Sequence, residues 1–143
     1  MKYKKNVTLI FIVVLLILYY LISPLFKNII LNEASPEGIQ SKATSSIIIG
    51  YAGHYATGTL KIITSENKRY IRYENFKTIN GPDLYVYLSK DVEAKDYIDL
   101  GRIKATEGNI NYEIPKDIDL KQYHYVMTWC KKFGVLFNYV DLN

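Results

Sequence analysis

The single cysteine of this 143-residue chain, Cys130, is the residue with the most distinctive chemistry. Lys131 and Lys132 follow it directly, and nearby cations stabilise the thiolate, the nucleophilic and metal-binding form of cysteine. On an extended strand Cys130 shares a face with Val126 and Thr128. A structural role as a small buried side chain is therefore the alternative, and residue type alone favours it. With no second cysteine, an intrachain disulfide is impossible.

The two histidines, His54 and His124, are the other candidate ligands for a metal or a haem. His124 precedes Cys130 by six positions, so on one strand their side chains would lie about 20 Å apart and could not share a metal. His54 could approach Cys130 only through the fold, and it is the more plausible partner of Cys130 in binding a cofactor. Two histidines and one cysteine without close spacing do not predict a metal site.

Motifs of conventional enzymes are absent from the sequence. It has no Gly-x-Ser-x-Gly motif, no phosphate-binding loop and no His-Glu-x-x-His motif. No serine, histidine and aspartate have the spacing of a recognisable triad. A conventional enzyme is therefore not predicted.

Residues 47–143 are expected to form one small all-β domain, either a sandwich or a barrel-like fold. Short alternating or β-branched segments recur there between turn residues, and no segment has a convincing helical period. Most of the 14 tyrosines lie in this region, as pleated surfaces favour. The expected strands cover residues 47–51, 57–64, 69–76, 84–88, 96–100, 111–114, 123–130 and 135–140.

The N-terminal part of the chain predicts a membrane anchor. Residues 7–26 carry no charge, and twenty helical residues span about 30 Å, the thickness of a bilayer's hydrocarbon core. Three lysines precede this segment, so the positive-inside bias places residues 1–6 in the cytoplasm and the later residues outside the cell membrane. A cleaved signal peptide is the alternative, but the apolar run is long and ends in a poor cleavage site. Residues 27–46 are expected to be a linker.

The charge distribution argues against a nucleic-acid partner. The formal net charge of +4 suggests a basic protein. However, four of the 18 basic residues lie at positions 2, 4, 5 and 27, before the first acid. From residue 28 onward 14 basic residues face 14 acidic ones, so the expected β domain has no electrostatic basis for binding nucleic acid.

A set of glycine, proline and aromatic residues resembles one known family, the DM-thirteen domain family, also called the electron-transfer DM domain. The resemblance covers nearly all of residues 47–143, and its most specific segments are Gly-Pro-Asp-Leu-x-Val-x-Leu, Asn-Tyr-x-Ile-Pro and Trp-Cys-x-x-Phe in that order. The chain departs from the family at residues 139–142, where members tend to have small residues. The matching positions are Gly50, Tyr51, His54, Ala56, Gly58, Thr59, 76–89, 97–101, Gly108, 111–115, Tyr123, Val126, 129–133 and Phe137.

The resemblance implies a β-rich module outside the cytoplasm, similar to DOMON domains, which bind haem or sugars. The family's characteristic cysteine corresponds to Cys130, which the resemblance proposes as a redox thiol or a cofactor ligand. It also implies haem as a candidate cofactor, with Cys130 and His54 as the candidate ligands.

Two functions follow as hypotheses. The first is a membrane-anchored redox or electron-transfer module that acts through Cys130 and works with another extracytoplasmic redox or surface protein. The second is a cell-surface binding or adhesion domain, in which Cys130 is structural and the abundant tyrosines contact a partner.

Overall fold

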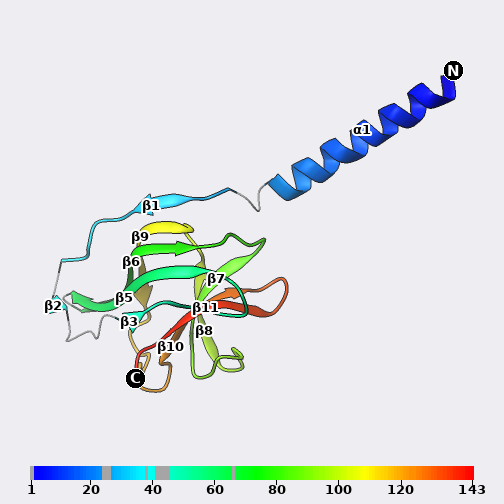
Figure 1. Cartoon of the computed structure of the whole chain (residues 1–143). Helices are drawn as coiled ribbons and strands as arrows, with labels where there is room; N and C mark the ends of the chain where they lie inside the picture. Colours follow the sequence, from blue (N-terminus) through cyan, green and yellow to red (C-terminus); the bar gives the residue numbers. More distant parts are fainter. Residues whose placement is uncertain (1, 24–26, 38, 41–45, 66) are drawn as a thin grey trace.

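The computed structural model describes residues 2–23, 27–37, 39–40, 46–65 and 67–143 (Figure 1). Helix α1 (Lys2–Ile22) carries exposed apolar side chains along its length. In the described part of the chain, no helix combines the length and apolar character that crossing a bilayer requires. The spanning helix expected over residues 7–26 is therefore not confirmed, and residues 24–26 of it lie outside the described residues.

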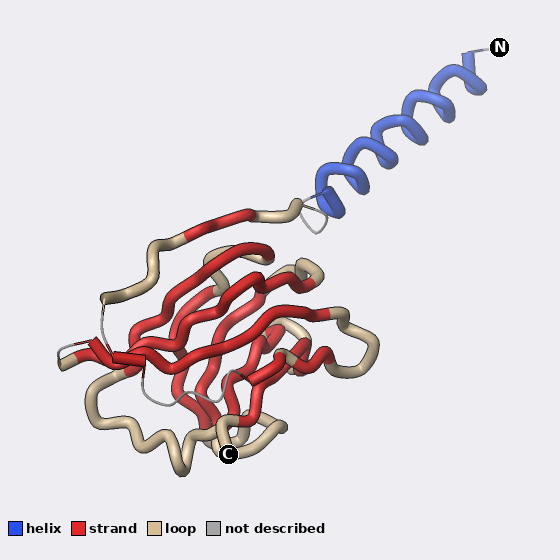
Figure 2. The backbone as a smooth tube through the Cα atoms, turned by 60° about the vertical axis from the view of Figure 1, so that its left-hand side comes forward, coloured by secondary structure: helices blue, strands red, loops and turns tan. Residues whose placement is uncertain are grey.

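Two β-sheets make up the rest of the described chain, as Figure 2 shows. The first sheet has the order β1-β9-β6-β5-β2, with β3 also paired to β5. All its pairs are antiparallel except β1 with β9, which is parallel. Its strands are β1 (Ile30–Asn32), β2 (Ile39–Gln40), β3 (Ser46–Ile47), β5 (Ala56–Ser65), β6 (Lys68–Thr78) and β9 (Glu107–Ile114).

The second sheet is antiparallel throughout and has the order β4-β11-β10-β7-β8. The hairpin of β10 and β11 supplies its centre, and β7 pairs with the other edge of β10. Its strands are β4 (Ile49–Gly50), β7 (Leu84–Ser89), β8 (Tyr97–Arg102), β10 (Tyr125–Cys130) and β11 (Val135–Asp141).

The main hydrophobic core lies between the two sheets. Leu60 and Ile71 of the first sheet belong to the same buried cluster as Leu88, Val126 and Val140 of the second. Each of these side chains is almost fully removed from water, and burying such a side chain contributes about 1.5–3 kcal/mol. The all-β prediction is confirmed, and of its two expected forms the structure adopts two sheets around a shared core.

The first sheet includes a strand from the segment expected to be a linker. β1 pairs with β9, with Leu31 opposite Gly108, and the Glu33 N–H donates to the Asn109 carbonyl oxygen (2.8 Å). Part of the expected linker is therefore a strand of the domain. With the sequence Ile-Leu-Asn, β1 is too short to show a strand period, so its pairing with the edge of β9 accounts for its extended form. Residues 38 and 41–45 of that segment lie outside the described residues.

Glu33 attaches this N-terminal strand to the sheet. Its carboxylate accepts a hydrogen bond from the Asn111 N–H (2.6 Å) and pairs with the Lys104 ammonium (3.0 Å). The guanidinium of buried Arg72 donates to the Glu33 carbonyl oxygen (3.2 Å). Partial burial raises the pKa of Glu33, but these donors and cations outweigh it and hold the pKa below its ordinary value of 4.5.

The lowered pKa of Glu33 predicts an acid-sensitive contribution to stability. A carboxylate whose pKa is depressed on folding stabilises above its unfolded pKa, and this contribution is lost as pH falls through the folded value. We expect Glu33→Gln to lower the free energy of unfolding by about 1.5 kcal/mol at pH 7, the lower end of the range for a hydrogen bond to a charged group. The difference from wild type should begin to shrink as the pH falls through 4.5 and vanish below the lowered folded pKa, as urea unfolding at a series of pH values measures.

A suitable control is Glu113→Gln, because Glu113 pairs with Lys68 at an exposed site (2.9 Å). Exposed pairs contribute little, so this variant should unfold as wild type does across the same pH range. A loss for Glu33→Gln that persists unchanged at acidic pH would contradict the assignment.

Candidate functional site

Cys130 ends β10 with its side chain on the inner face of the second sheet. Its burial is complete, and it packs with Leu84 and Phe137, with Ile103 at the edge of the cluster. The neighbouring Trp129 packs instead in a separate cluster on the outer face. The alternation expected from the sequence is therefore present, with the cysteine inside.

A β-bulge turns Phe137 toward Cys130. In the pairing of β10 with β11, Trp129 lies opposite Leu136 and Thr128 lies opposite Asn138, so Phe137 is the extra residue. A bulge adds one residue to one strand and redirects its side chain. Leu136 consequently packs on the outer face, whereas Phe137 packs against Cys130.

The loop after β4 brings His54 onto Phe137. The Tyr51 N–H donates to the Phe137 carbonyl oxygen (2.9 Å), and the His54 N–H donates to the Tyr51 carbonyl oxygen (2.9 Å). Gly50 allows this tight turn, because a Cβ there would overlap the His54 carbonyl oxygen. The His54 and Phe137 rings then stack, with centroids 4.0 Å apart and planes 9° from parallel.

The hydrogen bonding of His54 decides which of its ring nitrogens carries the proton. Nδ1 of His54 lies 2.9 Å from the Tyr51 carbonyl oxygen. A carbonyl oxygen only accepts hydrogen bonds, so Nδ1 carries the proton. In the neutral ring Nε2 is then an acceptor or a ligand, and this orientation by a backbone carbonyl is typical of functional histidines.

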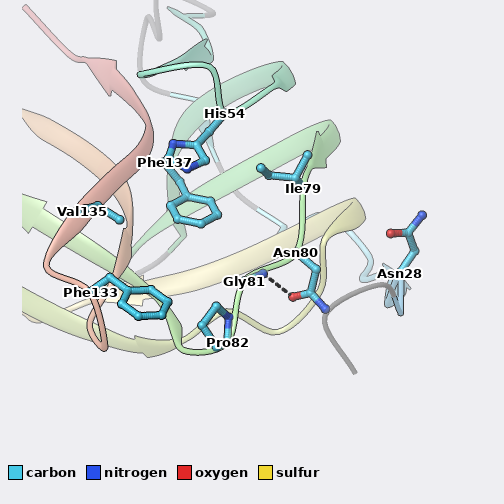
Figure 3. A pocket seen from close by; sticks show the side chains of 9 residues that line it. All are labelled: Asn28, His54, Ile79, Asn80, Gly81, Pro82, Phe133, Val135 and Phe137. Carbon is cyan, nitrogen blue, oxygen red and sulfur yellow. Dashed lines mark hydrogen bonds between the residues drawn. The ribbon is translucent and has the colours of Figure 1, made fainter. Parts of the chain in front are cut away.

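A cavity of about 600 Å³ opens beside the stacked rings (Figure 3). Its volume is within the range of small-molecule sites, and its wall is mainly apolar. Asn80 closes one side, where its amide donates to the Lys27 carbonyl oxygen (2.9 Å) and accepts from the Gly81 N–H (2.8 Å). The lining residues are Asn28, His54, Ile79, Asn80, Gly81, Pro82, Phe133, Val135 and Phe137.

The two lysines after Cys130 have partners elsewhere. The Lys131 ammonium lies 4.8 Å from the centre of the Tyr85 ring and 3.8 Å from the Asp99 carboxylate. Tyr85 belongs to the outer-face cluster, so this charge is on the side of the sheet opposite the thiol. The Lys132 ammonium lies 5.9 Å from the centre of the Phe133 ring.

His124 is not part of this site. It precedes β10, whereas Cys130 is that strand's last residue, and its Nδ1 lies 2.8 Å from the Asp141 carboxylate at the end of β11. Among the described residues, no group of three or more histidine, cysteine, aspartate or glutamate side chains is arranged to hold a metal ion.

The residues present do not fit a haem held jointly by Cys130 and His54. The thiol is fully buried and contributes nothing to the cavity wall, whereas His54 lines it. Phe137 stacks on His54 and belongs to the same buried cluster as Cys130, so it lies between the two parts of the site. Of these two residues, only His54 can contact a molecule in the cavity directly.

The chain was compared with models of known protein families. The model described as "Electron transfer DM13" matches residues 49–142. The chain belongs to the electron transfer DM13 family. The matched residues contain β4 to β11, and with them His54, Cys130 and Phe137, so the resemblance expected from the sequence is confirmed. No curated protein and no solved structure shows significant similarity to the chain.

Several residues of this candidate site were not recognised as such from the sequence. Phe133, Phe137 and the turn of Asn80 to Pro82 appear among the family's matching positions but were not assigned to a site. Their aromatic or turn-forming types are equally common in a core or a loop, so residue type carries no signal. Their place among the positions that match the family was the available indication.

Proposed function

We propose that this DM13 domain is an electron-transfer module whose redox centre comprises Cys130 and the adjacent cavity. Family membership supports a redox role. The observation that carries the assignment to these residues is the position of Phe137, which belongs to the same buried cluster as Cys130 and stacks on His54 at the cavity wall. The thiol therefore lies in the cluster of side chains directly behind the cavity wall.

The chemical roles follow from this arrangement. Cys130 is either a thiol that gives one electron and its proton to an oxidised molecule in the cavity and regains both from the reduced molecule, or a ligand reached when Phe137 moves aside, because the sulfur is completely buried. His54 supplies a hydrogen-bond acceptor or ligand atom to the cavity. The apolar wall excludes water and strengthens the polar interactions formed there.

Substitution of Cys130 tests the proposal. We expect the absorption spectrum or thiol content of the purified full chain to change reversibly on treatment with a mild oxidant and then a reductant. Cys130→Ala should abolish that change while lowering the free energy of unfolding by only about 1 kcal/mol, because little volume is lost. Cys130→Ser should be less stable than Cys130→Ala, since its hydroxyl is buried among apolar side chains.

Val126→Ala is the matched control, since Val126 lies on the same strand and inner face. It should be destabilised and yet keep the redox response. A response that survives in Cys130→Ala, or a wild-type thiol that reacts only after global denaturation, would contradict the proposal.

A binding module with a structural cysteine is the second candidate, favoured by the aromatic outer face of the second sheet. Tyr87 stacks on partly exposed Tyr97 (centroids 4.2 Å apart) and lies 6.5 Å from the Trp129 ring. Tyr51 and Tyr139 extend this face toward a smaller cavity of about 390 Å³. Contiguous aromatic surface is typical of sites that bind partners. Partner binding that is retained in Cys130→Ala would favour this second function.

The location of the domain is part of the proposal. In it, the N-terminal segment attaches the chain to the cell membrane, with residues 1–6 in the cytoplasm and the domain outside. The exposed apolar side chains of α1 and the lysines before them support this arrangement. The electron partner is then another extracytoplasmic redox or surface protein. Release of the full chain from isolated membranes by an alkaline wash would count against the attachment.

A further inference from the structure

The cavity beside His54 combines aromatic rings with an oriented acceptor atom on the histidine. Phe133 and Phe137 present ring surfaces to it, and Figure 3 shows them on one side, with Ile79 and Asn80 on the other. Flat aromatic molecules pack well between such walls. Since Nδ1 of His54 is bonded to the Tyr51 carbonyl oxygen, the neutral ring offers Nε2 as an acceptor to a donor on the ligand.

The mouth of the cavity is apolar as well as its wall. Phe133 is 65% exposed, Ile79 41% and Val135 38%, and all three line the cavity. Exposed apolar side chains at the mouth of a cavity can accommodate a hydrocarbon substituent that extends from a bound ring. The Lys27 carbonyl oxygen, which follows the apolar N-terminal segment, is bonded to Asn80 at the cavity edge. The cavity therefore lies where the domain meets that segment.

We propose that this cavity binds the ring of a hydroquinone, with one hydroxyl donating to Nε2 of His54 and the ring packed against Phe133 and Phe137. The inference rests on the proposed electron-transfer function and names its ligand class. A hydroquinone is a flat ring that carries electrons, and its O–H groups are the donors that Nε2 requires. The oxidised quinone has only carbonyl acceptors and cannot make the same bond, so the reduced form binds more tightly.

The exposed apolar mouth favours a ligand with a lipid tail. The ring could come from a soluble phenol or from a membrane-soluble carrier. Two probes distinguish these sources: a tail-less dimethoxy-methyl hydroquinone and the same ring with a decyl substituent. If the tail packs on Phe133 and Ile79, the decyl form binds more tightly than the tail-less form. Equal affinities would assign the cavity to a soluble hydroquinone.

Anaerobic calorimetry on the purified full chain in detergent tests the inference with these probes. The reduced tail-less probe should bind about fivefold more tightly than its oxidised form, the factor contributed by one ordinary hydrogen bond. His54→Phe keeps a ring that stacks on Phe137 but removes the acceptor, so it should lose this fivefold preference. His54→Gln, which restores an acceptor oxygen, is a second variant in case the first folds poorly.

His124→Phe is the matched control, because His124 bonds to Asp141 outside the cavity. It should bind the probes as wild type does. The inference is overturned if neither form binds, if both forms bind equally, or if His54→Phe keeps the preference for the reduced probe. Because this test does not involve Cys130, its failure leaves the redox test of Cys130 intact, and the converse also holds.

Discussion

Phe137→Ala is expected to expose the Cys130 thiol to solution. Phe137 is 6% exposed, lines the cavity and shares a buried cluster with Cys130, so removing its ring is expected to open a path from the cavity to the thiol. It should also destabilise the domain by about 3–5 kcal/mol, as for other buried Phe→Ala changes. An aromatic disulfide reagent, with release of its chromophore followed by absorbance, measures how fast Cys130 reacts in the folded protein.

Leu136→Ala provides the matched control, because Leu136 is equally buried on the same strand but packs on the outer face, away from Cys130. A Leu→Ala change costs a similar 2–5 kcal/mol or so. If the thiol is reached by local opening, Phe137→Ala should react at least about tenfold faster than Leu136→Ala, which corresponds to an opening free energy lower by about 1.4 kcal/mol. Equal rates would mean that the reagent reaches Cys130 only through global unfolding.

This result bears directly on function. A thiol that becomes accessible when one aromatic ring moves can exchange electrons with a molecule in the cavity without unfolding of the domain. A thiol reached only through global unfolding is structural, and the binding function is then the better account.

Gly108→Ala is expected to detach β1 from the first sheet. Gly108 has a φ of +120°, and a Cβ there would overlap the Leu31 carbonyl oxygen of the paired strand. The positive φ alone costs about 1–2 kcal/mol for a residue with a side chain. Loss of the β1 pairing and of the Glu33 contacts should bring the total to about 3 kcal/mol.

Gly101→Ala separates the cost of backbone strain from the cost of losing the β1 pairing. Gly101 has a similar φ of +106°, but nothing lies within 4 Å of an added Cβ, so only the backbone strain applies. Urea unfolding should show a loss near 1 kcal/mol for this variant. Amide exchange at Glu33, whose N–H donates to the Asn109 carbonyl oxygen, should accelerate only in Gly108→Ala. Unchanged protection of that amide would refute the role of Gly108.

Detachment of β1 is also expected to alter the candidate site. Asn28 lines the cavity, and the Ile29 N–H donates to the Thr106 hydroxyl (3.0 Å) just before β9. The residues that lead into β1 therefore form part of the cavity wall. We expect ligand binding and strand docking to be coupled, each stabilising the other.

Local patterns in the sequence determined the β class of this protein, the approximate positions of most strands and the face on which Cys130 lies. These features depend on side-chain alternation with a period of two, which any strand with one buried face must show. The alternation of Val126 and Cys130 against Met127 and Trp129 is a direct example.

Only the tertiary structure decided what surrounds Cys130. The bulge at Phe137 arises from a register shift between β10 and β11, and no residue type in β11 marks it. His54 reaches Phe137 through contacts between segments more than eighty positions apart, and β1 is extended only because β9 offers it an edge. Such features depend on pairing between distant segments, so the sequence contained the residues of the cavity but not their convergence.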